Sequence, residues 1–350
     1  NLKQQDKLSE QIKIDAAKAC RERLKNNNID LNAYHTAAIA ADVEDLRRTL
    51  GIKQWHLYGA SYGTKIALRV IADFPSGIAS AVLDSVLPPN IRYDEENVAN
   101  LLLVLKTMFD DCDQSTACKK AFPNLQQRFS SALDRIDSEP VTIKLNNDSR
   151  AMISMDRLKL LSLFDFSSPS SIKRMPLLAN AIANRDTKLL AQATRMPLGG
   201  SRYSWGMRLS VWCSEEIPFV QNKIMDTIAK STIQYVVEPS VCDAWHVDSR
   251  PESEIASVTS DIPVLLISGQ YDSVTPSTWA YKAAKTLTNS KVVVIKGGGH
   301  APMQDWSGDG CAMKIATQFI NDSSSLIETN RTLPSCINQL SAPVFTTKLP

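Results

Sequence analysis

The pentapeptide Gly-Ala-Ser-Tyr-Gly at positions 59–63 constrains this chain more than any other stretch. A short apolar run at 55–58 precedes it, and apolar residues at helical spacing follow it at 64–74. A G-x-S-x-G sequence between a strand and a helix is typical of a sharp turn that exposes the serine hydroxyl. We expect both glycines to be required, because a Cβ at either position would collide with neighbouring backbone. The bare pattern is common, and the alternative is a serine in an ordinary surface loop.

Two buried strands are predicted near the C-terminus, and each is followed by a residue that suits serine chemistry. Positions 262–269 form a continuous apolar run, and Asp272 follows in the next loop. The second run, at 291–295, leads into three glycines and His300. The carboxyl ends of parallel strands gather functional groups at one edge of a sheet. We therefore predict that Ser61, Asp272 and His300 meet there as a Ser-His-Asp triad.

The residue types assign a role to each member of this predicted triad. Ser61 would attack a carbonyl, His300 would take its proton and return it to the leaving group, and Asp272 would fix the imidazole tautomer. The backbone N–H of Tyr62 is predicted to be one donor of the oxyanion hole. Three alternatives stay open. Asp272 can be a turn former, His300 can be an ordinary loop histidine, and Asp84, at the end of the strand after the pentapeptide, can be the acid instead.

Several motifs outside the pentapeptide carry a resemblance to a known family. They are Tyr-His-Thr at 34–36, Asp-Val-Glu-Asp-Leu-Arg at 42–47, Leu-Asp-Ser at 83–85 with Pro-Pro at 88–89, and Ser-Val-Trp-Cys-Ser-Glu-Glu at 210–216. With Ser-Tyr-Gly-Thr at 61–64 and the Asp272 and His300 loops, they resemble the tripeptidyl aminopeptidase and proline iminopeptidase group of α/β-hydrolases over about residues 30–340.

The resemblance implies both a fold and an activity. The fold is α/β, a doubly wound and mostly parallel sheet with an inserted, mostly helical cap. The activity is hydrolysis of a peptide bond near a free N-terminus through an acyl-enzyme. Some members of the wider group are plain esterases, so the fold does not settle the substrate. A carboxylesterase acting on small esters is therefore one alternative. An inactive or incomplete hydrolase fold is the other.

The predicted elements divide the chain into three parts. Residues 1–90 are expected to be the first part of the hydrolase core, residues 91–260 the cap, and residues 261–350 the C-terminal part of the core. Apolar spacing predicts cap helices at 98–109, 125–136, 155–164, 172–185 and 224–232, with a short extended piece at 139–145. A cap excludes water and restricts which substrates reach the serine.

The segment before the pentapeptide departs from the family pattern. In that family several strands precede the strand-to-helix turn that carries the serine, called the elbow. A His-Gly-Gly-Pro-like loop among those strands supplies a second oxyanion N–H. Here the spacing predicts one helix around 8–24 and another from an N-cap at Thr36 to Gly51. We infer that the N-terminal strands of the family are absent from this chain. A cleaved fragment, a truncated product or one of two chains would each explain this.

Six of the seven cysteines are expected to form disulfides. Cys112 and Cys118 bracket a short polar loop and would close it as a small bridge. The resemblance implies two further pairs, which join positions 213 to 242 and 311 to 336. The alternative is a set of reduced, partly buried thiols in a cytosolic enzyme.

Cys20 is the cysteine that these pairs leave over. An odd cysteine indicates either a free thiol or a partner elsewhere. We expect a companion N-terminal segment linked through Cys20. Disulfides form in oxidising compartments, so we expect a secreted or periplasmic protein.

Substrate recognition is the last prediction for the site. An exopeptidase must recognise a free α-ammonium, which calls for carboxylates at a fixed distance from the nucleophile. Glu215 and Glu216 are the predicted carboxylates. The alternatives are a solvated charged pair and a carboxylate bonded within the cap.

The composition fits a globular enzyme without a nucleic-acid partner. Hydrophobic residues make up 43% of the chain, charged residues 22%, and the net charge is +2. Lysines and arginines are dispersed, so no basic patch is expected. No stretch of eighteen apolar residues predicts a membrane span. We expect no metal or other cofactor, because no Cys/His cluster with metal-ligand spacing occurs.

Overall fold

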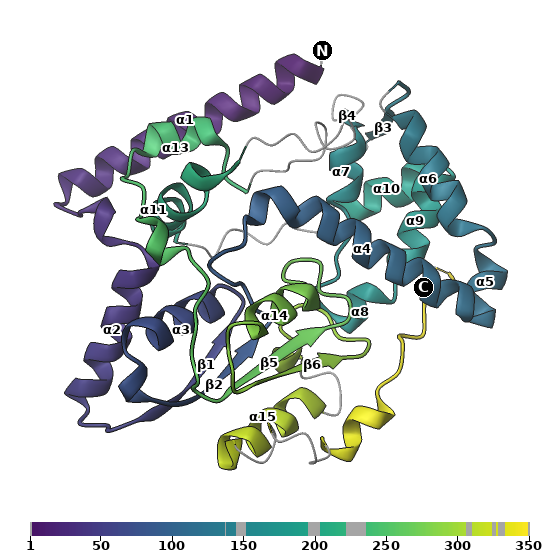
Figure 1. Cartoon of the computed structure of the whole chain (residues 1–350). Helices are drawn as coiled ribbons and strands as arrows, with labels where there is room; N and C mark the ends of the chain where they lie inside the picture. The colour runs from purple at the N-terminus through teal and green to yellow at the C-terminus, as the bar shows by residue number, and fades with distance from the viewer. Residues whose placement is uncertain are drawn as a thin grey trace.

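A parallel sheet lies in the lower half of the view in Figure 1, with helix α15 (Cys311–Asn321) below it and most of the other helices above. The computed structural model describes residues 2–136, 138–144, 152–194, 204–221, 236–305, 310–323, 327 and 333–348. Within these residues the sheet has four strands in the order β1-β2-β5-β6. The strands are β1 (Trp55–Ala60), β2 (Ile78–Asp84), β5 (Val264–Gly269) and β6 (Ser290–Ile295). Strands β1, β5 and β6 lie where apolar runs predict them, and β2 ends at Asp84, where the sequence also predicts the end of a strand.

The central strands are apolar because helices cover both faces of the sheet. Every residue of β5 is buried, as expected of a strand in a parallel sheet. Leu83 and Leu266 point toward α3 and its neighbours, whereas Val82 and Leu265 point toward α15. The covering helices are α2 (Thr36–Thr49), α3 (Tyr62–Asp73), α14 (Ser277–Ala284) and α15 (Cys311–Asn321). This is the doubly wound sheet expected from the resemblance.

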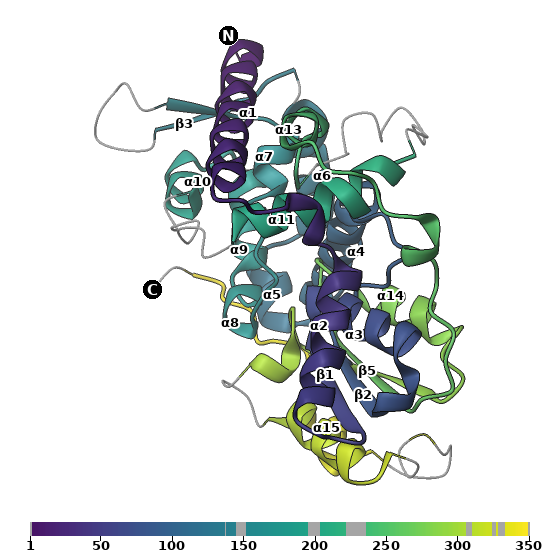
Figure 2. The ribbon, with the colours of Figure 1, turned by 90° about the vertical axis from the view of Figure 1, so that its left-hand side faces the viewer.

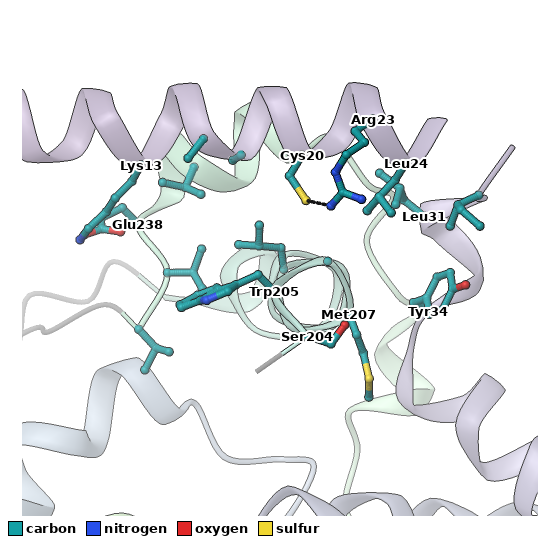
Figure 3. A pocket seen from close by; sticks show the side chains of 18 residues that line it. Lys13, Cys20, Arg23, Leu24, Leu31, Tyr34, Ser204, Trp205, Met207 and Glu238 are labelled. Carbon is teal, nitrogen blue, oxygen red and sulfur yellow. Dashed lines mark hydrogen bonds and ion pairs between the residues drawn. The ribbon is translucent and has the colours of Figure 1, made fainter. Parts of the chain in front are cut away.

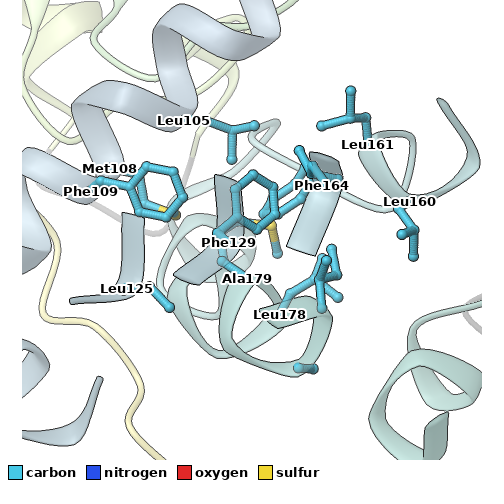
Figure 4. Close-up of a cluster of buried hydrophobic side chains, with 14 of the residues drawn as sticks. Leu105, Met108, Phe109, Leu125, Phe129, Leu160, Leu161, Phe164, Leu178 and Ala179 are labelled. Carbon is cyan, nitrogen blue, oxygen red and sulfur yellow. The ribbon is translucent and has the colours of Figure 1, made fainter. Parts of the chain in front are cut away.

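The chain between β2 and β5 is mostly helical, as predicted. The helices of its described residues are α4 (Tyr93–Gln114), α5 (Thr116–Ala121), α6 (Leu125–Ile136), α7 (Arg157–Leu161), α8 (Pro169–Ile172), α9 (Met175–Ala183), α10 (Thr187–Thr194), α11 (Trp205–Glu215) and α13 (Pro239–Trp245). Helices α4, α6 and α9 share an apolar cluster (Figure 4). The ring of Phe129 lies 5.4 Å from that of Phe109 and 5.7 Å from that of Phe164.

Two of the predicted cap helices differ from the structure, and a third is not described. Met155 belongs to a hairpin of β3 (Val141–Lys144) and β4 (Met152–Met155), where it pairs with Val141. Both side chains are buried on the same face of the hairpin. Met155 therefore follows the alternation of buried and outward-facing side chains in a strand, and the helix begins later, at α7. The helix predicted at 172–185 is divided into α8 and α9, because the proline of the first turn of α9 lacks an N–H and begins a new helix. The helix predicted at 224–232 lies outside the described residues.

The N-terminal segment is helical, as the spacing predicts. Helix α1 (Leu2–Asn26) packs on α13 and α11 through Ala17, Leu209 and Val241, away from the sheet (Figures 1 and 2). Helix α2 has His35 as its N-cap, so the predicted Thr36 cap is wrong. His35 Nδ1 accepts a hydrogen bond from Ala38 N. Thr36 is instead the first helical residue, and its N–H and hydroxyl are used elsewhere, as described below.

Short 3₁₀ helices complete the connections. They are η1 (Leu31–Ala33), η2 (Pro75–Gly77), η3 (Ile217–Phe219), η4 (Glu252–Glu254), η5 (Pro302–Gln304) and η6 (Ser335–Gln339). Three disulfides join the predicted partners, Cys112–Cys118, Cys213–Cys242 and Cys311–Cys336. Among the described residues, no helix is long and apolar enough to cross a membrane.

Candidate active site

Ser61 occupies a strained turn between β1 and α3. Its backbone has φ 54° and ψ −124°, a positive-φ conformation that residues other than glycine rarely adopt. A Cβ at Gly59 would lie 2.4 Å from the carbonyl oxygen of Gly63, so position 59 requires glycine, as predicted. Position 63 has open space for a Cβ, so the expectation that both glycines are required is wrong for Gly63. Tyr62 begins α3, and its N–H belongs to the first turn, where amides have no helical partner.

The structure brings Asp272 and His300 into direct contact. His300 Nδ1 lies 3.0 Å from both carboxylate oxygens of Asp272. Asp272 is buried and also accepts hydrogen bonds from Val274 N, Thr275 N and the Thr275 hydroxyl, at 2.9, 2.8 and 2.8 Å. Four donors therefore converge on one carboxylate and fix its orientation.

The surroundings of His300 stabilise its charged form. Burial opposes the charge, but the hydrogen bond and the negative charge of Asp272, with a contribution from Asp84, outweigh it and raise the pKa of His300 above its ordinary value. Among the described residues, Nδ1 contacts Asp272 and Thr275, which lies 3.2 Å away. The Asp84 carboxylate instead accepts a hydrogen bond from Met303 N.

The end of β2 connects the Ser61 turn to the His300 loop. Ser61 N donates to Asp84 O at 2.9 Å, and Ala301 N donates to the Ser85 hydroxyl at 2.7 Å. Asp84 and Ser85, which are consecutive at the end of β2, thus bond to the backbone of Ser61 itself and to the residue after His300. The predicted serine and the predicted histidine therefore belong to one end of the sheet.

Glu215 and Glu216 lie in a buried ion-pair cluster with Lys65. Lys65 Nζ lies 3.0 Å from Glu215 Oε2 and 2.9 Å from Glu216 Oε1, and all three side chains are at most 4% exposed. Burial alone would lower the pKa of Lys65, but the two carboxylates raise it above its ordinary value. Both carboxylates are buried, so they are not the solvated charged pair considered as an alternative.

The two carboxylates differ in how fully they are bonded. Glu215 also accepts hydrogen bonds from Thr36 N and the Thr36 hydroxyl, at 2.6 and 2.7 Å. Glu216 Oε2 has no hydrogen-bond partner among the described residues, and Arg92 Nη1 is 3.9 Å away from it. The Thr36 hydroxyl lies 2.9 Å from Tyr62 OH, which links this cluster to the residue after Ser61.

Sequence reasoning missed Lys65 as a member of this cluster. A signal was present, because Lys65 falls between buried positions in the helical pattern of α3. A lysine on a buried helix face needs a carboxylate partner. The identity of that partner depends on the packing of α11 against α3, which spacing along the chain does not reveal.

Cys20 lies in the wall of a cavity of about 850 Å³ between α1 and α11 (Figure 3). Its thiol accepts a hydrogen bond from Arg23 Nη2 at 3.5 Å, and it forms no disulfide. Trp205 and Tyr34, which also line the cavity, are partly exposed.

Two families match parts of the sequence. The family described as "alpha/beta hydrolase fold" matches residues 15–157, and the family described as "TAP-like protein" matches residues 230–326. The serine protease Hip1 of Mycobacterium tuberculosis, like that of Mycobacterium bovis, is 21% identical over 315 residues. The match covers 81% of this chain and 59% of Hip1, so the chain spans less than two thirds of the length of these curated relatives.

Solved structures of hydrolases also align with the chain. A meta-cleavage product hydrolase from Pseudomonas fluorescens is 12% identical, with a TM-score of 0.37 and coverage of 83% of this chain and 73% of the hydrolase. A thermophilic esterase from Thermogutta terrifontis is 14% identical, with a TM-score of 0.34 and coverage of 84% and 74%. The order of the parallel strands and the turn at Ser61 agree with the two partial family matches: the chain has an α/β-hydrolase fold, and its residues 230–326 are similar to the TAP-like family.

Proposed function

We propose that this protein is a serine hydrolase with Ser61 as nucleophile, His300 as general base and acid, and Asp272 as the acid that orients His300. The observation that carries the proposal is the 3.0 Å contact between His300 Nδ1 and the buried Asp272 carboxylate. Nδ1 bonded to a carboxylate leaves Nε2 to accept the serine proton. The elbow conformation of Ser61 supports the same assignment, since strained residues cluster at active sites.

The proposed reaction proceeds through an acyl-enzyme. Ser61 Oγ adds to the substrate carbonyl while His300 Nε2 takes its proton, and the Asp272 carboxylate stabilises the imidazolium that forms. The Tyr62 N–H, at the positive end of α3, donates to the oxyanion. His300 then protonates the leaving group. Water then attacks the acyl carbon with the same histidine as base, the bond to Ser61 Oγ breaks, and His300 returns the proton to Oγ as the carboxylic acid product leaves.

The proposed substrates are peptides with a free N-terminus. Glu216 is the better of the two predicted ammonium acceptors, because its Oε2 is buried and has no hydrogen-bond partner among the described residues. Both oxygens of Glu215 are already bonded to Thr36, and one of them also to Lys65. We therefore assign the recognition of the α-ammonium to Glu216, and the orientation of the cluster to Glu215.

A fluorophosphonate probe tests the nucleophile. We expect labelling of Ser61 in the wild-type protein and none in Ser61→Ala, with the site located by peptide mass spectrometry. Intact wild-type protein without label at Ser61 would refute the proposal and favour an inactive hydrolase fold.

Matched substrates test the specificity. The substrates are peptide amides with a free N-terminus, the same amides with an acetylated N-terminus, and small esters. We expect the amides with a free N-terminus to be cleaved in preference to the other two classes. Glu216→Gln should remove that preference, and Glu96→Gln is a control carboxylate that bonds Trp279 Nε1 instead. Equal cleavage of free and blocked peptides, or cleavage of esters alone, would favour the carboxylesterase.

The proposal includes a companion N-terminal segment and an oxidising compartment. Within the described residues, β1 pairs with β2 on one side only, and an open edge of this kind presents unpaired backbone groups to a further strand. Cys20 is the cysteine without a disulfide, and three disulfides favour a secreted or periplasmic protein. Intact mass of the native protein before and after reduction tests the link. A mass that reduction leaves unchanged would contradict a segment bound through Cys20.

A further inference from the structure

Asp84 is a second buried carboxyl group near His300, and the triad does not use it. It ends β2 and is fully buried. Its Oδ2 accepts hydrogen bonds from Met303 N at 3.1 Å and from Tyr58 OH at 3.4 Å. Its Oδ1 is buried without a hydrogen-bond partner among the described residues. A buried carboxyl with a free oxygen is costly, so its presence calls for an explanation.

Asp84 and its neighbour bond to both loops of the proposed site. The Asp84 carbonyl accepts from Ser61 N, and its side chain accepts from Met303 N, three residues after His300. The Ser85 hydroxyl accepts from Ala301 N, next to His300. Ser85 and Ala301 both have positive φ, 61° and 54°, so these bonds hold two unfavourable backbone conformations in place.

We propose that Asp84 and Ser85 form a clasp that positions the His300 loop on the Ser61 turn, and that the Asp84 carboxyl sets the pH range in which the imidazole accepts a proton. Asp84 is thus a positioning residue, which acts through His300. This inference rests on the proposed serine hydrolase and adds a residue to it.

The charges around the two groups give the direction of the effect. The charges that act on His300 are those of Asp272, in the loop after β5 and 3.0 Å from Nδ1, and of Asp84, at the end of β2. The groups that act on Asp84 are His300, Asp272 and, on β1, Tyr58, whose hydroxyl donates to its carboxylate. Burial raises the pKa of Asp84 to about 7, so this carboxyl becomes charged near neutral pH. A negative charge at Asp84 stabilises the imidazolium, so His300 keeps its proton to higher pH than with Asp272 alone.

The test is the pH dependence of Ser61 labelling by a fluorophosphonate, measured as a second-order rate constant. Labelling should fall on the acid side as His300 is protonated. In Asp84→Asn this acid limb of the pH profile should move to lower pH, because the imidazolium loses one of the two carboxylates that stabilise it. In Ser85→Ala the rate should fall at all pH values while the limb stays in place, because that variant loses a loop contact and no charge.

Tyr58→Phe is a second variant, and it leaves the buried Asp84 side chain in place. Tyr58 is 49% exposed, and its loss removes a donor that favours the charged form of Asp84. The acid limb should move in the same direction as in Asp84→Asn, and by less. If wild-type protein is labelled and both variants superimpose on its profile, the inference is refuted and the proposed function stands. If wild-type protein is not labelled at Ser61, the proposed function fails and this inference fails with it.

Discussion

Replacement of Lys65 by methionine measures how strongly the cap is joined to the helix that carries the elbow. Lys65, on α3, is the cation that bridges Glu215 and Glu216, at the end of α11. Methionine has a similar length and no charge. Without the ammonium group, Glu215 keeps its two bonds from Thr36, whereas Glu216 keeps, among the described residues, only Arg92, at 3.9 Å.

The magnitude follows from the burial of the cluster. Each of the three side chains is at most 4% exposed, so water cannot replace the lost ammonium group. Removing one partner of a buried ion pair costs about 3–5 kcal/mol, because the remaining charge is left uncompensated. The exposed pair Lys106–Asp110 is a matched control, with side chains 61% and 48% exposed. Lys106→Met should cost at most about 0.5 kcal/mol.

Urea unfolding of the three proteins at one pH and ionic strength measures both differences. The unfolding free energy of Lys65→Met should fall well below that of Lys106→Met. A third variant, Lys65→Met with Glu215→Gln and Glu216→Gln, should recover part of the loss because it also removes the uncompensated charges. A loss in Lys65→Met that equals the loss in Lys106→Met would refute the reasoning, since the cluster would then be as well solvated as a surface pair.

Two further predictions concern the elbow and the disulfides. Gly59→Ala should abolish labelling of Ser61, because its Cβ would lie 2.4 Å from the Gly63 carbonyl oxygen. Gly63→Ala should still be labelled, because the space around its Cβ is open. Equal labelling of the two variants would contradict this close approach. Replacing Cys213 and Cys242 by serine opens a loop with a sequence separation of 29 and should cost about 3–4 kcal/mol, against about 2 kcal/mol for Cys112 and Cys118, whose separation is 6. Thermal unfolding of the two double variants checks this order, and a larger loss at the shorter loop would argue against it.

The parts of the fold that sequence predicts are those that one local pattern determines. A strand buried on both faces reads as an apolar run, so β5 and β6 are predicted close to their observed bounds. Strand, turn and helix around Ser61 are likewise local. Residues 155–164 mislead because a buried Met155 fits a helix face and a strand face equally well, and only its pairing with Val141 decides.

The parts that sequence does not predict depend on contacts between distant segments. Thr36 is a good N-cap by residue type, but its N–H and hydroxyl bond to Glu215, and His35 caps the helix instead. Glu215 and Glu216 appear in the sequence as an adjacent charged pair, and their difference in bonding arises only when Lys65 and Thr36 pack against them. Gly63 matches the motif, yet only Gly59 must be glycine for steric reasons. A Cβ at position 59 would meet the backbone carbonyl of Gly63, whereas a Cβ at position 63 would point into open space.

The strain at Ser61 explains why so many distant bonds end at this turn. A non-glycine residue with positive φ persists only where its surroundings fix it, at a cost of about 1–3 kcal/mol. Ser61 N is held by Asp84 on β2, Tyr62 OH lies 2.9 Å from Thr36 on α2, and Lys65 bonds α11. These tethers come from the neighbouring strand β2, from α2 and from α11. Because the α11 tether is a buried ion pair, any motion that lifts α11 from α3 would expose or separate these charges. We therefore expect α11 to stay in place when substrate enters, and Glu216 to keep a fixed position relative to the serine, as its proposed role in binding the α-ammonium requires.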